Sequence, residues 1–127
     1  MGEWCTEHHR ESGLTEKVRN SSLSVTDCET QILDFLEDWT PRGKCPLAGN
    51  SVGQDAKFLE NHMPNLMKHL HYRIVDVSTV KELVKRWFPK DFHGKPGKIL
   101  AHRALDDIRE SIEELKYYRE AVFKEQK

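Results

Sequence analysis

The sequence predicts an α/β domain in which about two parallel strands are packed by several helices. Two short apolar segments, 44–49 and 71–77, have the length of strands, and the second has a β-branched centre. Each is followed by small or hydroxyl residues and then by apolar residues at helical spacing. A strand that turns into a helix in this way is the usual unit of a parallel sheet. With 127 residues, we expect 1–127 to form a single domain.

Composition restricts the classes of function. Charged residues make up 32% of the chain and the net charge is −1, so a polyanionic partner must be held by a local patch. Residues 81–98 are the candidate patch, with six Lys or Arg against two acids. We expect no membrane partner, because no apolar run approaches the roughly 20 residues that a membrane span needs. The three cysteines are widely spaced, which favours reduced thiols inside a cell.

Two helices are predicted around the first strand, after a segment 1–20 interpreted as two short helical pieces. Ser24 is a suitable N-cap for a helix that ends before Pro41 and that we expect to serve as scaffold. The apolar residues of its predicted packing face are Val25, Cys28, Ile32, Phe35, Leu36 and Trp39. A second helix follows the strand at 44–49 and continues to Pro64. Asp55 falls in its first turn, where it is either a helix-start acid or a metal carboxylate.

The second strand leads into a helix that begins with Ser78 and Thr79. Glu82 lies three residues after Thr79 and predicts a capping box. Hydroxyls and free N–H groups at a helix start also make a phosphate site, and Arg73 on the strand would add a bidentate contact. Simple capping and phosphate binding both remain open on these residues alone.

The last helix follows His102 and carries a predicted buried face. Its apolar residues recur at spacings of three and four, at Leu105, Ile108, Ile112 and Leu115. Helix geometry puts Asp107 at the edge of that face and Asp106 in solvent. His102 and Asp107 share a site only if His102 stands in the loop before the first turn. The two acids then either complement the helix dipole or, with His102, supply a metal ligand and a general base.

Three segments together carry a resemblance to a known family. C-P-L-A-G-N-S-V-G-Q-D, H-Y-R-I-V-D-V-S-T-V-K-E-L and H-R-A-L-D-D-I-R-E-S closely resemble the oligoribonucleases, in the version found in animals. The similarity runs in order along essentially all 127 residues. It implies a ribonuclease-H-like fold and a homodimeric 3′→5′ exoribonuclease of the DEDDh class. Such enzymes degrade very short single-stranded RNAs, down to dinucleotides, with two Mg²⁺ or Mn²⁺ ions.

The resemblance assigns the catalytic residues one by one. Asp55 matches the second acidic motif, and Asp107 matches the third, within H-x-A-x-x-D. Both are therefore implied to be metal ligands. His102 is similar to the general base that deprotonates the attacking water.

The resemblance also assigns substrate-binding residues. Four residues look like the cap that holds the terminal 5′ phosphate: Ser51, Arg73, Ser78 and Thr79. Trp4 looks like the wedge that stacks on a base, and His9 matches a histidine near the substrate. Tyr72 is similar to the tyrosine that approaches the active site from the dimer partner.

One departure from the family pattern changes what we expect of the activity. The family's first motif, D-x-E, lies on its first strand, and Met1–Trp4 aligns with a stretch roughly after the first three strands. The resemblance then implies a fold without these strands and without two of the four acidic ligands. We expect activity to fall by several orders of magnitude, as when a cooperative catalytic unit loses a member. The alternative is an impaired short isoform that binds small RNA or a dimer partner without cleaving. Animal relatives imply mitochondria as the compartment, with cytosol or nucleus as alternatives.

Overall fold

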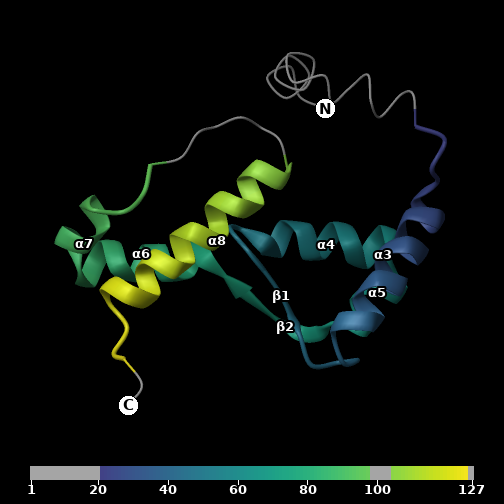
Figure 1. The fold of residues 1–127 in the computed structure, drawn as a ribbon, viewed down its shortest axis with the longest axis horizontal. Coiled ribbons are helices and arrows are strands. Elements are labelled where there is room, and N and C mark those ends of the chain that lie inside the picture. The colour runs from purple at the N-terminus through teal and green to yellow at the C-terminus, as the bar shows by residue number, and fades with distance from the viewer. Residues whose placement is uncertain (1–20, 98–103, 126–127) are drawn as a thin grey trace. The chain divides into compact units, whose positions relative to one another are not determined.

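The computed structural model describes residues 21–97 and 104–125 (Figure 1). The chain divides into two compact units, which are treated separately: 23–83, and the described part of 1–22 together with 84–127. The predictions for Trp4, His9 and His102, and for the helical pieces in 1–20, lie outside the described residues. The expectation of a single domain over 1–127 stays a prediction. None of the helices in the described ranges is both long and apolar enough to cross a bilayer.

A two-stranded parallel sheet organises the first unit and confirms the α/β prediction. β1 (Pro46–Gly49) pairs with β2 (His71–Asp76), so that Gly49 lies opposite Asp76. The connection between them runs through α4 (Val52–His62) and α5 (Pro64–His69), and both helices contact the sheet. α6 (Val77–Trp87) begins directly after β2. Because parallel strands end at the same edge, the turn after β1 and the start of α6 are neighbours.

The pairing of β2 with β1 is interrupted at Tyr72 and Arg73. Pro46 pairs with His71, but the next residue of β1, Leu47, pairs with Ile74. Two residues of β2 therefore have no counterpart on β1, which is a β-bulge. Such irregularities redirect side chains and are frequent near functional sites.

The first helix of the described chain, α3 (Val25–Trp39), begins as predicted but turns a different face to its neighbours. The Ser24 side chain accepts a hydrogen bond from the Asp27 N–H at 3.0 Å, which confirms the N-cap. The predicted packing face is wrong, because Ile32, Phe35 and Trp39 are exposed. Glu29, which points elsewhere on the helix, is only 7% exposed. α3 is therefore held to its neighbours by polar contacts as well as apolar ones.

Glu29 caps the first turn of α5. Its Oε2 accepts hydrogen bonds from the backbone N–H groups of Asn65 at 3.0 Å and Leu66 at 3.1 Å. Its Oε1 accepts one from Asn65 Nδ2 at 3.3 Å. The N–H groups of a first helical turn have no acceptor within their own helix, so a buried carboxylate here replaces the water they would otherwise need.

A buried histidine ties the other end of α3 to α5. Thr40 Oγ1 donates to the Leu36 carbonyl at 2.7 Å, so the same oxygen accepts the contact from His69 Nε2 at 2.8 Å. His69 Nε2 therefore carries its proton. The carbonyl of His69 accepts the N–H of Gly43 at 2.7 Å. Both ends of α3 are thus attached to α5 by hydrogen bonds, through Glu29 near its start and through Thr40 at its end.

We predict that Glu29→Ala lowers the free energy of unfolding by about 2–4 kcal/mol, because it leaves the N–H groups of Asn65 and the buried Leu66 without their acceptor. Glu37→Ala is the matched control, since Glu37 is exposed on the same helix. It should change the free energy by no more than about 0.5 kcal/mol. Urea denaturation followed by circular dichroism measures both values. Equal effects of the two substitutions would contradict the assigned cap.

The second unit contains α7 (Pro89–His93) and α8 (Ala104–Ala121). The Tyr117 hydroxyl of α8 donates to the Asp91 carbonyl of α7 at 2.6 Å. Tyr118 is 0% exposed, and its hydroxyl donates to Glu114 Oε2 at 2.5 Å. Burial raises the pKa of Tyr118, so its hydroxyl remains a neutral donor at physiological pH.

The predicted buried face of α8 is also wrong. Three of its four apolar residues are about half exposed: Leu105 at 57%, Ile108 at 54% and Ile112 at 48%. The helix instead buries the side of Glu114 and Tyr118, which lies about 120° around the axis from the centre of the apolar stripe. Asp106 is half-buried and Asp107 exposed, the reverse of the expected order.

We predict that Tyr118→Phe lowers the free energy of unfolding by about 1–2 kcal/mol, because the buried Glu114 carboxylate loses a hydrogen-bond donor. Tyr72→Phe is the control, since Tyr72 is exposed, and it should be close to neutral. Chemical denaturation compares the two. A neutral Tyr118→Phe would show that this hydrogen bond adds nothing to stability.

Candidate functional site

Three side chains meet where the two strands end. Ser51 follows β1, Asp76 ends β2 and Ser78 lies in the first turn of α6. The Ser51 N–H donates to Asp76 Oδ1 at 2.9 Å and to Ser78 Oγ at 3.1 Å. The Ser78 N–H donates to the same Asp76 oxygen at 2.9 Å, and the Ser78 hydroxyl also donates to it. We call these residues the Ser51–Asp76–Ser78 cluster.

Ser51 has an unusual backbone conformation. With φ 54° and ψ 35° it lies in the left-handed region, and it is the only non-glycine residue with positive φ in the described ranges. This conformation costs a residue with a Cβ about 1 kcal/mol or more. The two acceptors of the Ser51 N–H offset that cost. Backbone strain of this kind is concentrated at binding and catalytic sites.

Asp76 is the residue that sequence reasoning missed. The capping box predicted from Thr79 and Glu82 is wrong, since Asp76 immediately precedes α6 and accepts the Ser78 N–H. Asp is among the strongest N-cap residues, so D-V-S at the end of a predicted strand was the available signal. Thr79 lies in the first turn of α6 and is exposed.

The cluster favours an ionised Asp76. The hydrogen bond from the Ser78 hydroxyl is the largest cause that lowers the pKa of Asp76. Partial burial acts in the opposite direction, and the N–H groups of Ser51 and Ser78 lower the pKa further. Hydrogen bonds that favour the charged form lower a carboxyl pKa in this way.

This pKa shift predicts how stability depends on pH. A depressed folded-state pKa adds stability above the unfolded-state value of about 3.9, and that stability is lost as pH falls through the folded-state pKa. The advantage of wild type over Asp76→Asn should therefore shrink in acid. Denaturation from about pH 6 to about pH 2.5 measures it. Ser78→Ala removes the largest cause and should reduce the same pH dependence. A difference between wild type and Asp76→Asn that is independent of pH would contradict the shift.

The two predicted metal carboxylates lie in different units. Asp55 is exposed in the first turn of α4, one turn after Ser51. Asp107 is exposed in the first turn of α8, on the side that this helix buries further along at Glu114. Carboxylate oxygens suit Mg²⁺ or Mn²⁺. Within the part of the chain that the structure describes, however, no three His, Cys, Asp or Glu side chains group as a metal site. Each of the two carboxylates fits a divalent ion in chemistry.

The sequence contains a single D-x-E spacing, Asp27 and Glu29, and the structure shows that it is not a strand motif. Both residues lie in α3, where Glu29 is buried against α5. This pair is a structural element of the helix packing.

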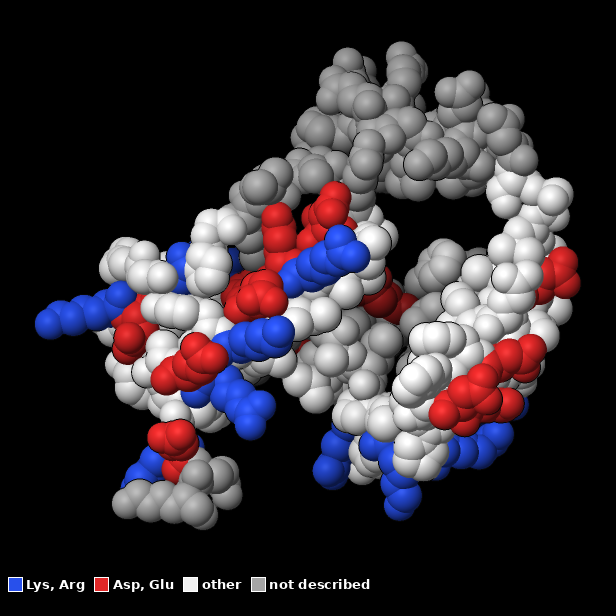
Figure 2. Space-filling view, in the orientation of Figure 1, with Lys and Arg blue, Asp and Glu red and all other residues white. Residues whose placement is uncertain are grey.

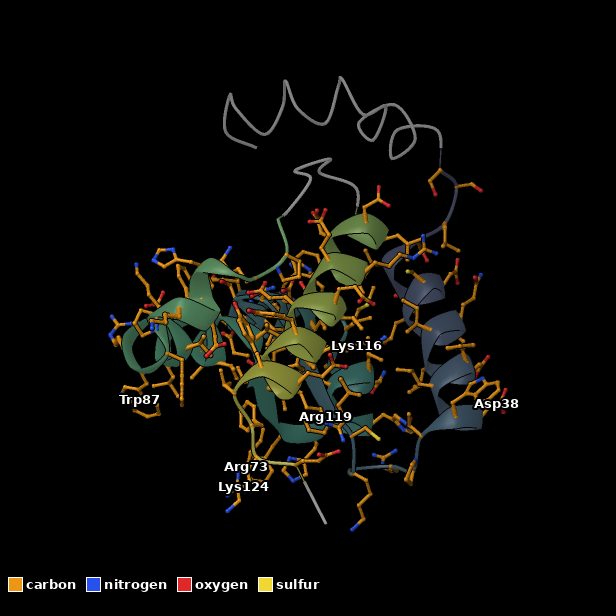
Figure 3. The ribbon with its side chains drawn as sticks, turned by 60° about the vertical axis from the view of Figure 1, so that its left-hand side comes forward. Asp38, Arg73, Trp87, Lys116, Arg119 and Lys124 are labelled. Carbon is orange, nitrogen blue, oxygen red and sulfur yellow. The ribbon has the colours of Figure 1, made fainter. Side chains whose placement is uncertain are left out.

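Arg73 is not part of the Ser51–Asp76–Ser78 cluster. Its guanidinium lies 5.3 Å from the centre of the Tyr72 ring. The His71 ring stacks on the Tyr72 ring, with 4.5 Å between the ring centres. Figure 3 shows Arg73 projecting from β2. Arg73 and Asp76 are about 10 Å apart along the strand, and an odd separation places their side chains on opposite faces. The structure thus brings Ser51 and Ser78 together, with Thr79 adjacent, but leaves Arg73 with Tyr72.

Charge is unevenly distributed among the helices. α3 has five acidic residues and no Lys or Arg, and Figure 2 shows acidic side chains exposed along it. In the basic stretch, Lys95 Nζ lies 5.3 Å and Lys85 Nζ 6.0 Å from the centre of the Phe92 ring. Cation–π contacts of this kind gather positive charge around an aromatic ring. α3 is therefore unfavourable for a polyanion, and the stretch around Phe92 is favourable.

Comparison with known proteins identifies what this chain is similar to. The RNase_T family model, described as an exonuclease, matches residues 1–115. The chain is 57% identical over 124 residues to "Oligoribonuclease, mitochondrial" of Mus musculus, covering 98% of this chain and 52% of the mouse protein. It is 56% identical over 124 residues to "Probable oligoribonuclease" of Dictyostelium discoideum, covering 98% and 64%. It is 56% identical over 126 residues to "Oligoribonuclease" of Vibrio campbellii, covering 98% and 68%. The chain thus spans about half the length of the mouse relative.

Proposed function

This chain belongs to the RNase_T exonuclease family, and we propose that it supplies part of the active site of a 3′→5′ exoribonuclease that degrades very short RNAs. The observation that carries the proposal is the Ser51–Asp76–Ser78 cluster at the carboxyl end of both strands, with Asp55 in the helix that follows. The edge where parallel strands end is where α/β folds bind ligands. The names of its relatives supply the substrate class, short RNA.

The cluster is proposed to hold the terminal 5′ phosphate of the substrate. Ser51, Ser78 and Thr79 supply hydroxyl groups next to the start of α6, where a helix favours negative charge. A pocket that is capped at the 5′ end leaves no exit for a longer strand. Such a cap supports the proposed preference for very short substrates.

Tyr72 and Arg73 are proposed to act from an exposed surface of β2. Tyr72 is 78% exposed, and Arg73 lies over its ring away from the cluster. An exposed tyrosine at a bulge is suited to contact a second molecule. This placement supports a homodimer in which Tyr72 approaches the substrate bound by the other copy. The resemblance also supports Arg73 as a phosphate contact, for which its guanidinium must leave the Tyr72 ring and turn toward the cluster.

The chemistry is assigned to His102, Asp55 and Asp107. His102 is proposed to accept a proton from the water that attacks the 3′-terminal phosphodiester, so that the P–O3′ bond breaks and a 5′ mononucleotide leaves. Divalent ions, Mg²⁺ or Mn²⁺, would be held in part by Asp55 and Asp107 and would stabilise charge on the phosphate. Trp4 is proposed to stack on a base, and His9 to lie near the substrate. The mammalian relatives are named as mitochondrial, and we propose the same compartment here.

A second candidate function is binding without cleavage. It is favoured by the Ser51–Asp76–Ser78 cluster, whose hydroxyl and N–H groups suit a phosphate without the help of a metal ion. In this case the chain would retain short RNA, or a dimer partner, through the same cluster and through Tyr72.

Calorimetry with a 5′-phosphorylated diribonucleotide and its 5′-hydroxyl counterpart tests the shared part of both functions. We expect the phosphorylated form to bind at least about 10-fold more tightly, because hydrogen bonds to a charged group are worth about 1.5–3 kcal/mol. Ser51→Ala should lower this preference about 5- to 10-fold. Ser22→Ala, at an exposed serine outside the cluster, should leave it unchanged. Equal affinity of wild type for the two dinucleotides would overturn the proposed phosphate site.

Turnover separates the two candidate functions. Hydrolysis of the phosphorylated dinucleotide is measured with Mn²⁺ for wild type and for His102→Ala. Cleavage that requires His102 supports the nuclease, whereas binding without cleavage supports the second candidate. Cleavage that persists in His102→Ala would contradict the assigned base.

A further inference from the structure

We propose that Asp76 is a positioning residue that orients Ser51 and Ser78 for the phosphate, an inference that rests on the proposed function. Asp76 is not assigned to the phosphate cap by resemblance. Its role follows from the hydrogen bonds of the cluster, all of which lie within the first unit.

A single carboxylate oxygen connects two turns of the chain. Asp76 Oδ1 accepts the Ser51 N–H at 2.9 Å and the Ser78 N–H at 2.9 Å, as well as the Ser78 hydroxyl. One donor comes from the turn after β1, and the others come from the start of α6. The position of Ser51 relative to α6 is therefore fixed through Asp76.

The left-handed conformation of Ser51 depends on these acceptors. At φ 54° the backbone is unfavourable for serine, and its N–H is held by Asp76 and by Ser78 Oγ. The backbone conformation decides where the Cβ and hydroxyl of Ser51 point. Without Asp76, we expect Ser51 to relax toward a common conformation and its hydroxyl to turn.

The directions of the hydroxyl hydrogen bonds decide which serine can donate directly to a phosphate. A serine hydroxyl has one proton, and that of Ser78 is donated to Asp76. The Ser78 oxygen then accepts the Ser51 N–H. The Ser51 hydroxyl reaches Ser78 Oγ only at 3.5 Å, which is a weak contact, so its proton is available to a ligand. Ser51 is thus the direct donor to phosphate, and Ser78 acts through it.

The proposed role of Asp76 requires a hydrogen-bond acceptor at this position but does not require a negative charge. A charge close to a bound phosphate would be unfavourable, but the oxygen of Asp76 is already occupied by three donors. An asparagine offers the same acceptor without the charge. A serine is a good N-cap for α6 but its side chain is one bond too short to reach the Ser51 N–H.

The test compares Asp76→Asn and Asp76→Ser with wild type by calorimetry, using the phosphorylated and 5′-hydroxyl dinucleotides. Asp76→Asn should keep the preference for the phosphate within about threefold of wild type. Asp76→Ser should lower the preference about 10-fold, with the affinity for the 5′-hydroxyl form changed by less than about threefold. Thermal unfolding of each variant establishes that it is folded.

Each outcome decides a separate question. A wild type without preference overturns the proposed function itself. A wild type with preference that Asp76→Ser retains overturns only the role of Asp76. If Asp76→Ser loses affinity equally for both dinucleotides, Asp76 has a merely structural role. If Asp76→Asn gains about 10-fold in preference for the phosphorylated dinucleotide, the carboxylate of Asp76 repels the phosphate. Both results contradict positioning. If Asp76→Ser does not fold, Ser78→Ala removes the second acceptor of Ser51 while leaving Asp76 as the cap. An unchanged preference in Ser78→Ala would overturn the indirect role of Ser78, and a lost preference in Asp76→Asn would overturn the role of Asp76.

Discussion

The parallel pairing of β1 with β2 is the constraint on which the site depends. It brings the turn after Gly49 beside the start of α6, although Ser51 and Asp76 are 25 residues apart in the chain. Neither turn alone provides a ligand site, because Ser51 would lack its acceptors and α6 would have only a helix cap. The hydrogen bonds between them convert two ordinary chain reversals into one polar cluster. The position of the cluster therefore follows from the parallel pairing of the two strands.

Polar contacts also decide which faces of the helices are buried. Glu29 on α3 and the Thr40–His69 contact hold α3 against α5, and α8 buries Glu114 with Tyr118. The apolar stripes of α3 and α8 remain substantially exposed within the described residues. A buried carboxylate is stable only with its donors in place, so these contacts allow few alternative packings. They hold α3 against α5, the helix that leads into β2.

Local signals in the sequence predicted the strands, the helix order and the Ser24 cap, because these depend on nearby residues. The resemblance added roles for Ser51, Ser78, Asp55 and Asp107. The buried faces of α3 and α8 were not predictable, since periodicity reveals an apolar face but not what covers it. Asp76 was missed because its partner Ser51 is distant in sequence. His102, Trp4 and His9 lie outside the described residues, so their roles remain predictions.

The bulge in β2 has a consequence for how this surface can change. It adds two residues to β2, and side chains in a strand alternate with a period of two. An insertion of two residues therefore preserves the facing of every later position, including Asp76. Tyr72 and Arg73 can be substituted, or the bulge reshaped, without shifting the register that places Asp76 opposite Gly49. The exposed surface of β2 can therefore change in shape while Asp76 stays opposite Gly49 and within reach of Ser51.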